Sequence, residues 1–308
     1  MKLRVVIPVV VAMASLLPGA ALSAKQTLLS KQIAAVQSAT KNKVATAAVS
    51  KNLATMSTTS WYQSDIYRGC NKLGDTCRYG TGNKWVAIYG DSHAPIWAFA
   101  LVPALRKMGY RVVMYWRSGC TPAHLDVNAT MCTSAWRQSV EDAITKGPKK
   151  ASAVIVVERT SDVTLKNGAT VSASMWRDSL AETLSFFKRS GVTTVLWGDN
   201  PVALFGTTYN PTYMPSSCVS LHLTNLRTCD TSLSAALAIN LITAERTAAT
   251  TAGVGYVDTT AWFCSRSTMT CPPVIDSMVV NYDTFHVSWL YAAKLTPLAS
   301  ETLTPLLK

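Results

Sequence analysis

Two short motifs near opposite ends of the chain contain the side chains of a nucleophile and its base. The first, Gly90-Asp91-Ser92-His93, supplies a serine hydroxyl, and the second places Asp283 three residues before His286. A serine attacks a carbonyl only when a base removes its proton, and a carboxylate bound to the other ring nitrogen fixes the tautomer of that base. One turn of chain can bring Asp283 to Nδ1 of His286, which leaves Nε2 for the Ser92 proton.

The other three histidines fit the role of base less well. His93 adjoins Ser92, so its side chain is expected to diverge from the hydroxyl, and His124 and His222 lie in loops between neighbouring cysteines. Taken alone, Asp283 is an ordinary cap of the last helix with the histidine in its first turn. A serine in a suitable motif elsewhere in the chain favours the catalytic interpretation.

The elements that must position these motifs follow from the hydrophobic pattern. Strands alternating with helices of ten or more residues predict a parallel sheet with helices on both faces. We therefore expect an α/β fold of the doubly wound, flavodoxin-like type, with three α/β/α layers and a mostly parallel five-stranded sheet. Ligands bind at the carboxyl ends of such strands, and Ser92 follows the first strand there. Strands are expected at 85–89, 112–116, 153–157, 194–197 and 255–257, and helices at 93–108, 133–146, 172–189, 231–251 and 287–305.

The two motifs resemble the first and last signature blocks of the SGNH (GDSL-like) hydrolases. The resemblance is closest to the SGNH domain of sugar and peptidoglycan O-acyltransferases, which occurs fused to acyltransferase-three membrane domains and also alone. It extends from about residue 61 to the end of the sequence and implies the SGNH hydrolase fold. The further matching features are, in chain order, Cys70 and Cys77, Ala94 and Trp97, Gly119-Cys120-Thr121-Pro122, Pro215 and Cys218, and Cys264 and Cys271.

The resemblance implies a role for each residue of the two motifs. Ser92 is the expected nucleophile, His286 the general base and Asp283 its partner, with no cofactor and no metal ion. Asp91 is expected to be a structural turn residue. The backbone N–H groups of Ser92 and Gly119 are expected in the oxyanion hole.

One block of the family pattern is missing. The Gly-x-Asn-Asp sequence that supplies a third oxyanion donor is replaced by Val157-Glu158-Arg159-Thr160 after the third expected strand. The Arg159 guanidinium is our candidate for this donor, because a fixed cation suits an oxyanion. Asn200, in a turn after the next strand, is a weaker candidate.

The implied activity is that of a serine esterase removing O-acyl groups, usually O-acetyl, from cell-surface or extracellular glycans through an acyl-serine intermediate. Transfer of the acyl group onto a surface polysaccharide, with a membrane acyltransferase as partner, uses the same residues and stays open. A non-catalytic glycan-binding protein on this fold is a further alternative. Trp97, Trp116 and Trp289 are candidates for stacking on sugar. A classical α/β-hydrolase is disfavoured, because the chain has no Gly-x-Ser-x-Gly elbow.

The first residues and the cysteines predict export. Lys2 and Arg4 precede an apolar stretch at 5–21 and small residues up to position 24, which is typical of a cleaved signal peptide more than of a membrane anchor. The remainder divides into a helical or flexible lead-in at 25–60, outside the core, and a hydrolase-like domain at 61–308. Export to the cell envelope or beyond favours disulfides over a metal site. Taken in order, the eight cysteines make four local pairs, although the sequence does not fix which of them bond: Cys70 and Cys77, Cys120 and Cys132, Cys218 and Cys229, Cys264 and Cys271.

The net charge of +12 indicates which classes of partner the protein attracts. Such an excess attracts anionic surfaces, which outside a cell are wall polymers, acidic glycans or lipid headgroups. The substrate itself is expected to be an O-acylated glycan or another ester, including anionic ones. No nucleic-acid-binding motif is present, so nucleic acid is not an expected partner.

Overall fold

A six-stranded sheet forms the centre of the computed structural model, which describes residues 27–58, 65–71, 75–146, 149–161, 163–204 and 213–308. The expected signal peptide lies outside these residues. The strands run in the order β1 (Thr76–Tyr79), β3 (Arg111–Trp116), β2 (Trp85–Gly90), β4 (Ala153–Val157), β5 (Thr193–Trp197) and β7 (Gly255–Val257).

The five expected strands are present and pair in parallel, and the sixth, β1, was not expected. It pairs with β3 in the antiparallel direction, at one edge of the sheet. Its four residues alternate between buried and exposed side chains. Such a short half-exposed strand lacks the continuous apolar run that marks the buried parallel strands.

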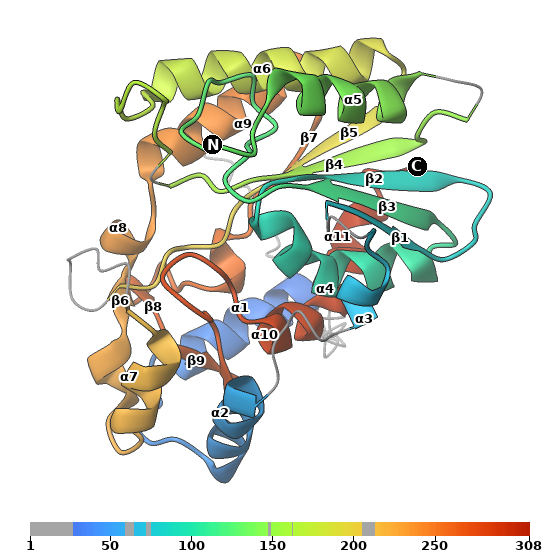
Figure 1. The fold of residues 1–308 in the computed structure, drawn as a ribbon. Helices are drawn as coiled ribbons and strands as arrows, with labels where there is room; N and C mark the ends of the chain where they lie inside the picture. Colours follow the sequence, from blue (N-terminus) through green and yellow to red (C-terminus); the bar gives the residue numbers. More distant parts are fainter. Residues whose placement is uncertain (1–26, 59–64, 72–74, 147–148, 162, 205–212) are drawn as a thin grey trace, which may run out of the picture.

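Helices cover both faces of the sheet (Figure 1). On the β2 strand, Val86 and Ile88 point into one core and Ala87 and Tyr89 into the other, as the period of two in a strand requires. One face packs against α4 (His93–Lys107), α1 (Leu28–Ala39), α10 (Trp289–Lys294) and α11 (Thr296–Leu303), and the other against α5 (Ser134–Thr145), α6 (Ala173–Arg189) and α9 (Ile239–Ala252).

Two helices that the sequence pattern predicts as continuous are broken. The Ala236 carbonyl accepts the Val202 N–H, which ends the first of them after one turn. Pro297 stands in the first turn of α11, where its missing N–H costs nothing, and separates that helix from α10. The stretch 231–251 thus becomes β6 (Thr231–Ser232), α8 (Leu233–Ala236) and α9, and 287–305 becomes α10 and α11.

The expectation that residues 25–60 stay outside the core is wrong for α1. Val36 and Ala39 are buried in the main core, and the Gln32 side-chain amide donates to the Trp262 carbonyl at 2.8 Å and to the Tyr291 hydroxyl at 2.7 Å. The sequence pattern shows that a face is apolar, but it does not show which surface covers it. The lead-in also contains α2 (Ala47–Thr58), which packs near α7 (Pro215–Leu221) and β10 (Met278–Val279).

Short elements and disulfides complete the described chain. The short elements are α3 (Asp65–Arg68), the 3-10 turns Leu226–Cys229 and Thr260–Trp262, and the strands β8 (Thr270–Cys271) and β9 (Val274–Ile275). The eight cysteines form four disulfides, each between two consecutive cysteines of the chain: Cys70–Cys77, Cys120–Cys132, Cys218–Cys229 and Cys264–Cys271. Within the ranges described, none of the helices has the length and apolar character needed to cross a membrane.

Candidate active site

The turn that carries Ser92 leaves the carboxyl end of β2 and opens α4. Gly90 is required there, because a Cβ atom at this position would lie 1.9 Å from the carbonyl oxygen of Val157 on the adjacent strand. Asp91 is buried, and its carboxylate accepts the N–H of His93 at 2.8 Å and that of Arg159 at 2.9 Å. Asp91 thereby joins the ends of β2 and β4 and fixes Ser92 as the residue that precedes α4.

The loop at 280–288 carries the acid and the base. Its two ends are joined by the Tyr282 N–H donating to the His286 carbonyl at 2.8 Å and the Ser288 N–H donating to the Val280 carbonyl at 2.7 Å. Ser288, not Asp283, caps the last helical region, since its hydroxyl accepts the Tyr291 N–H. The carboxylate is thus not needed as a helix cap.

The three expected side chains meet in one hydrogen-bonded chain. Nε2 of His286 lies 2.9 Å from Oγ of Ser92, although the two residues are 194 positions apart. Nδ1 of His286 lies 2.9 Å and 3.1 Å from the two carboxylate oxygens of Asp283. Burial opposes the charged form of Asp283, but its hydrogen bonds with His286 and Phe285 outweigh it and lower the pKa of this carboxyl. A charged carboxylate on Nδ1 suits a base that accepts a proton at Nε2.

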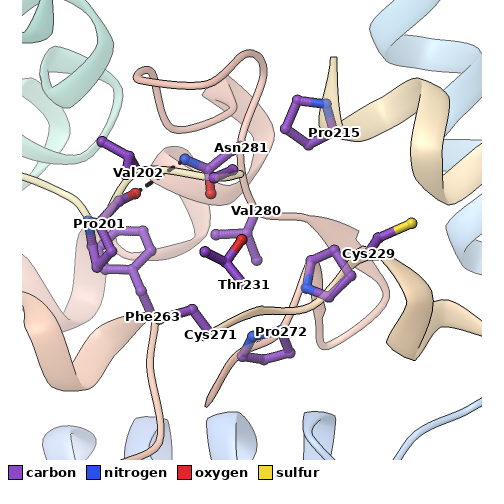
Figure 2. Close-up of a pocket in the computed structure, with 12 residues that line it drawn as sticks. Pro201, Val202, Pro215, Cys229, Thr231, Phe263, Cys271, Pro272, Val280 and Asn281 are labelled. Carbon is purple, nitrogen blue, oxygen red and sulfur yellow. Dashed lines mark hydrogen bonds between the residues drawn. The ribbon is translucent and has the colours of Figure 1, made fainter. Parts of the chain in front are cut away.

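The loop at 280–288 packs against the chain segment that follows β5 (Figure 2). Nδ2 of Asn281 donates to the carbonyl of Pro201 at 3.3 Å, beside a cavity of only about 10 Å³ lined mainly by proline and apolar side chains. The Ala203 N–H donates to the Thr284 carbonyl at 2.8 Å. Nδ2 of Asn200 donates to the carbonyl of Phe285 at 2.6 Å. The positions of the acid and the base are therefore set by the segment after β5 as well as by their own loop.

A second histidine lies against the first. His93 diverges from Ser92 as expected, and its Nδ1 lies 2.6 Å from Oδ1 of Asp199, at the end of β5. The ring centres of His93 and His286 are 4.7 Å apart. Burial alone would lower the pKa of His93, but the contact with Asp199 outweighs it and raises this pKa. Sequence reasoning missed Asp199 as a site residue, because its spacing from the other site residues follows no pattern.

The backbone donors expected for an oxyanion also lie at the carboxyl ends of the parallel strands. Among the described residues, the N–H groups of Ser92 and Gly119 have no hydrogen-bond acceptor. Gly119 has a φ of +67°, a conformation that glycine adopts without strain. Arg159 stands beside them, with its guanidinium 4.6 Å from the ring centre of Phe285. The buried Asn200 is excluded as the third donor, because its amide group already donates to Phe285 and Pro201.

A pocket of about 270 Å³ opens next to these donors. Its wall includes Gly119, Arg159, Thr121 and the exposed Asn128. The Thr121 hydroxyl donates to the buried carboxyl group of Glu158, whose pKa burial raises well above the ordinary value. The polar wall and open mouth of this pocket suit a hydrophilic ligand such as a sugar more than a long acyl chain.

Of the three tryptophans expected to stack on sugar, Trp97 is excluded by its burial. Trp97 is fully buried and packs edge-on against Trp197 and Trp262, which makes it part of the core. Trp116 and Trp289 are half-buried and pack against Tyr67 and Phe99. The spacing near Ser92 placed Trp97 close in sequence, but a helix buried on most sides turns that side chain away from solvent.

His124 and His222 lie away from the three-residue chain. Nε2 of His124 is 2.7 Å from the carboxylate of Glu141, so this side chain is satisfied near the surface as expected. His222 ends α7, its N–H bonded to the carbonyl of Cys218 at 3.1 Å. Neither supplies an alternative base for Ser92.

Comparison with known proteins gives one family match. Residues 62–301 match the family model described as "SGNH domain (fused to AT3 domains)". A search of curated proteins found no match.

Several solved structures are similar to this chain. The periplasmic domain of a lipopolysaccharide acetyltransferase from Salmonella ser. Paratyphi A is 13% identical over 82% of this chain and 98% of that chain, with a TM-score of 0.58. A putative acylhydrolase from Bacteroides fragilis is 13% identical over 81% and 100%, with a TM-score of 0.45. An acetylxylan esterase from Geobacillus stearothermophilus is 13% identical over 73% and 96%, with a TM-score of 0.44. At these identities a likeness bears on the fold alone.

Proposed function

Because the chain belongs to the SGNH family and has the fold of its hydrolases, we propose that Ser92, His286 and Asp283 form the catalytic triad of a serine esterase. The distance of 2.9 Å from Nε2 of His286 to Oγ of Ser92 is the observation that carries this proposal. The family consists of acyl hydrolases and acyltransferases. The proposal adds the residues, the substrate and the direction of the reaction.

The first half-reaction transfers the acyl group to the enzyme. Oγ of Ser92 attacks the ester carbonyl while Nε2 of His286 takes the hydroxyl proton, and Asp283 stabilises the imidazolium that forms. The negative oxygen of the tetrahedral intermediate is bound by the N–H groups of Ser92 and Gly119, with Arg159 as the third donor. His286 then gives its proton to the departing sugar oxygen, which leaves an acyl-serine.

The second half-reaction releases the acyl group to water. His286 removes a proton from a water molecule, which attacks the acyl carbon, and Oγ of Ser92 leaves with the proton returned. The polar pocket beside Gly119 and Arg159 suits a sugar, so we assign the leaving group to a glycan and the acyl group to O-acetyl. The four disulfides favour an exported protein acting in the cell envelope or outside the cell.

Transfer to a second sugar is the alternative, with the sugar hydroxyl in place of water. The family model that matches residues 62–301 describes an SGNH domain fused to AT3 domains, and this description supports the alternative. In that case a membrane acyltransferase is the expected donor partner. Both reactions pass through the same acyl-serine, so one set of variants tests both.

The test measures acetate release from p-nitrophenyl acetate and from acetylated wall glycan, for the wild type, Ser92→Ala and the control Ser152→Ala. Ser152 is exposed and precedes β4, at the opposite end of the sheet. We expect Ser92→Ala to lose at least about 10³-fold in kcat and the control to be unchanged. Acyl transfer to an added oligosaccharide, with little release to water, would support the alternative. Activity that persists in Ser92→Ala would refute both.

A further inference from the structure

A dense group of basic side chains covers the end of the sheet opposite the candidate active site. They stand in the loops and helix ends that precede β2, β3, β4 and β5, at the right of Figure 1. Seven are exposed and Arg111 is half-buried. We call this set the basic edge: Lys84, Arg106, Lys107, Arg111, Lys149, Lys150, Lys188 and Arg189.

Contacts between neighbouring loops make the basic edge one continuous surface. Nζ of Lys150, before β4, donates to the carbonyl of Ser190, before β5, at 2.7 Å. The guanidinium of Arg111 lies 5.9 Å from the ring centre of Trp85, whose Nε1 donates to the carbonyl of Lys149 at 2.8 Å. The cations from separate parts of the sequence therefore lie side by side.

Negative charge does not balance this surface in the described part of the chain. Asp142, on α5, is paired with Lys146 at 2.8 Å, and Glu301, on α11, accepts the Leu28 N–H. The basic edge contains eight of the 29 lysines and arginines of the chain. Leu29 is the exposed large apolar residue nearest to this surface, beside Leu28 and Lys107, so a partner would be held mainly by charge.

We propose that the basic edge binds anionic lipid headgroups at a membrane surface. Cations spread over four strands, roughly 14 Å at the usual strand spacing, match a flat array of phosphates better than a single polymer chain. An exposed aromatic platform, on which sugars would stack, is missing from the described residues of this edge. Since the strands are about 17–20 Å long, binding would leave the candidate active site facing away from the membrane, toward glycans that project from it.

The test is co-sedimentation of the full chain with phosphatidylcholine vesicles, with and without phosphatidylglycerol. The edge variant replaces Lys84, Lys107, Lys149 and Arg189 by glutamine, because these four side chains make no hydrogen bond or ion pair among the described residues. The control variant removes four exposed charges elsewhere, at Lys31, Lys41, Lys43 and Lys51.

We expect wild-type binding only to the anionic vesicles, lost as salt is raised. The edge variant should bind at least about tenfold more weakly, and the control by less than about twofold. An equal loss in both variants would show that net charge alone is responsible and would overturn the proposal. So would binding to a soluble anionic polysaccharide without binding to vesicles.

The second histidine–aspartate pair carries an independent inference. His93 has an exposure of 1% and Asp199 a side-chain exposure of 5%, and their contact of 2.6 Å lies directly beside the ring of His286. Asp199 also accepts the N–H groups of Thr160 at 3.1 Å and Asn200 at 2.7 Å. Nε2 of His93 is buried and has no partner among the described residues. Burying a polar atom without a hydrogen-bond partner costs free energy, so the unpaired Nε2 of His93 calls for an explanation.

We infer that His93 and Asp199 are positioning residues for His286, which rests on the proposed function of Ser92 and His286. The His93 ring blocks one side of the His286 ring and so keeps its Nε2 on Ser92. When His93 is protonated, its charge also disfavours a second cation on the neighbouring ring.

The charges around His93 fit this role. Asp199 after β5 and Asp91 before α4 favour its charged form, whereas Arg159 after β4 opposes it. The raised pKa of His93 therefore reflects two carboxylates that outweigh burial and one guanidinium. The loop of His286, which also carries the carboxylate of Asp283, faces the ring of His93.

Three variants separate charge from packing: His93→Gln, Asp199→Asn and the double variant. The first leaves the Asp199 carboxylate unbalanced beside His286, so the pKa of His286 and the acid limb of the kcat/KM profile should rise by about one pH unit. The double variant removes both charges, so both should return toward the wild-type values. All three variants should lower kcat by about tenfold, because the ring of His286 is held less firmly.

Proton NMR titration of the four histidines gives the pKa of His286 without any need for activity. Loss of kcat with an unshifted pKa in His93→Gln, or the same shift in the single and the double variant, would overturn the inference. A wild type that shows neither esterase nor transfer activity would instead overturn the proposed function.

Discussion

The carboxylate of Asp283 is held so that it does two things at once, and Asp283→Asn separates them. Oδ1 accepts the N–H groups of Phe285 at 2.8 Å and His286 at 2.7 Å, and Oδ2 lies 2.9 Å from Nδ1 of the His286 ring. An asparagine can keep both backbone bonds with its oxygen. Its amide nitrogen then takes the place of Oδ2, so a donor faces the ring.

The size of the effect follows from the tautomer. With an amide N–H directed at Nδ1, the neutral ring must carry its proton on Nε2, which is the atom 2.9 Å from the Ser92 hydroxyl. That nitrogen then donates to the serine and no longer accepts its proton. We expect kcat to fall by roughly 10³- to 10⁴-fold, which is about 4–5.5 kcal/mol of transition-state stabilisation.

The assay is kcat on p-nitrophenyl acetate at neutral pH, with the melting temperature as a check on folding. The control is Asp276→Asn, which removes a carboxylate that is paired with Lys294 at an exposed position in the same region of the chain. We expect the control to keep its activity within about twofold. A loss of less than tenfold in Asp283→Asn, with an intact fold, would show that Asp283 does not orient the base.

Two further predictions concern stability. Gly90→Ala should lower the free energy of unfolding by about 3 kcal/mol, because its Cβ would lie 1.9 Å from the backbone oxygen of Val157. Denaturant titration would measure this loss against Gly255→Ala, where the nearest atoms are side-chain carbons of Leu306 and Val195 at 3.3 Å or more. Equal losses in the two variants would contradict the steric argument. Burial raises the pKa of Glu245 to about 8, above its usual value of 4.5. The unfolded chain therefore loses this proton first, so the free energy of unfolding should fall as the pH rises from about 4.5 to about 8 and then level off. Glu245→Gln should flatten this part of the stability profile, and an unchanged slope would refute the assignment.

The elements that repeat a local pattern were predictable from the sequence. The continuous apolar runs of β2, β4 and β5 record burial on both faces, and their alternation with long helices left few possible folds. The spacing of Asp283 and His286 was also sufficient, because three residues of chain fix how far apart the two side chains can be. Four cysteine pairs that are near in sequence had short loops to close.

Features that depend on a distant partner were not predictable in this way. The edge strand β1 is recognised only by its pairing with β3, and the burial of α1 only by the surface that covers it. The core position of Trp97 depends on Trp197 and Trp262, which come from other elements.

For the site, strand, turn and helix are local patterns, so the residue types and the position of Ser92 after a strand were predictable without the fold. The packing of the whole fold brings His286, 194 residues later, to 2.9 Å from that serine. It also placed Asp199 and His93 beside them and gave the Asn200 amide to the Phe285 carbonyl. Hydrophobic periodicity shows which side chains are buried but not which other side chains they contact. Those contacts form when the loops at the carboxyl ends of β2, β4 and β5 pack together.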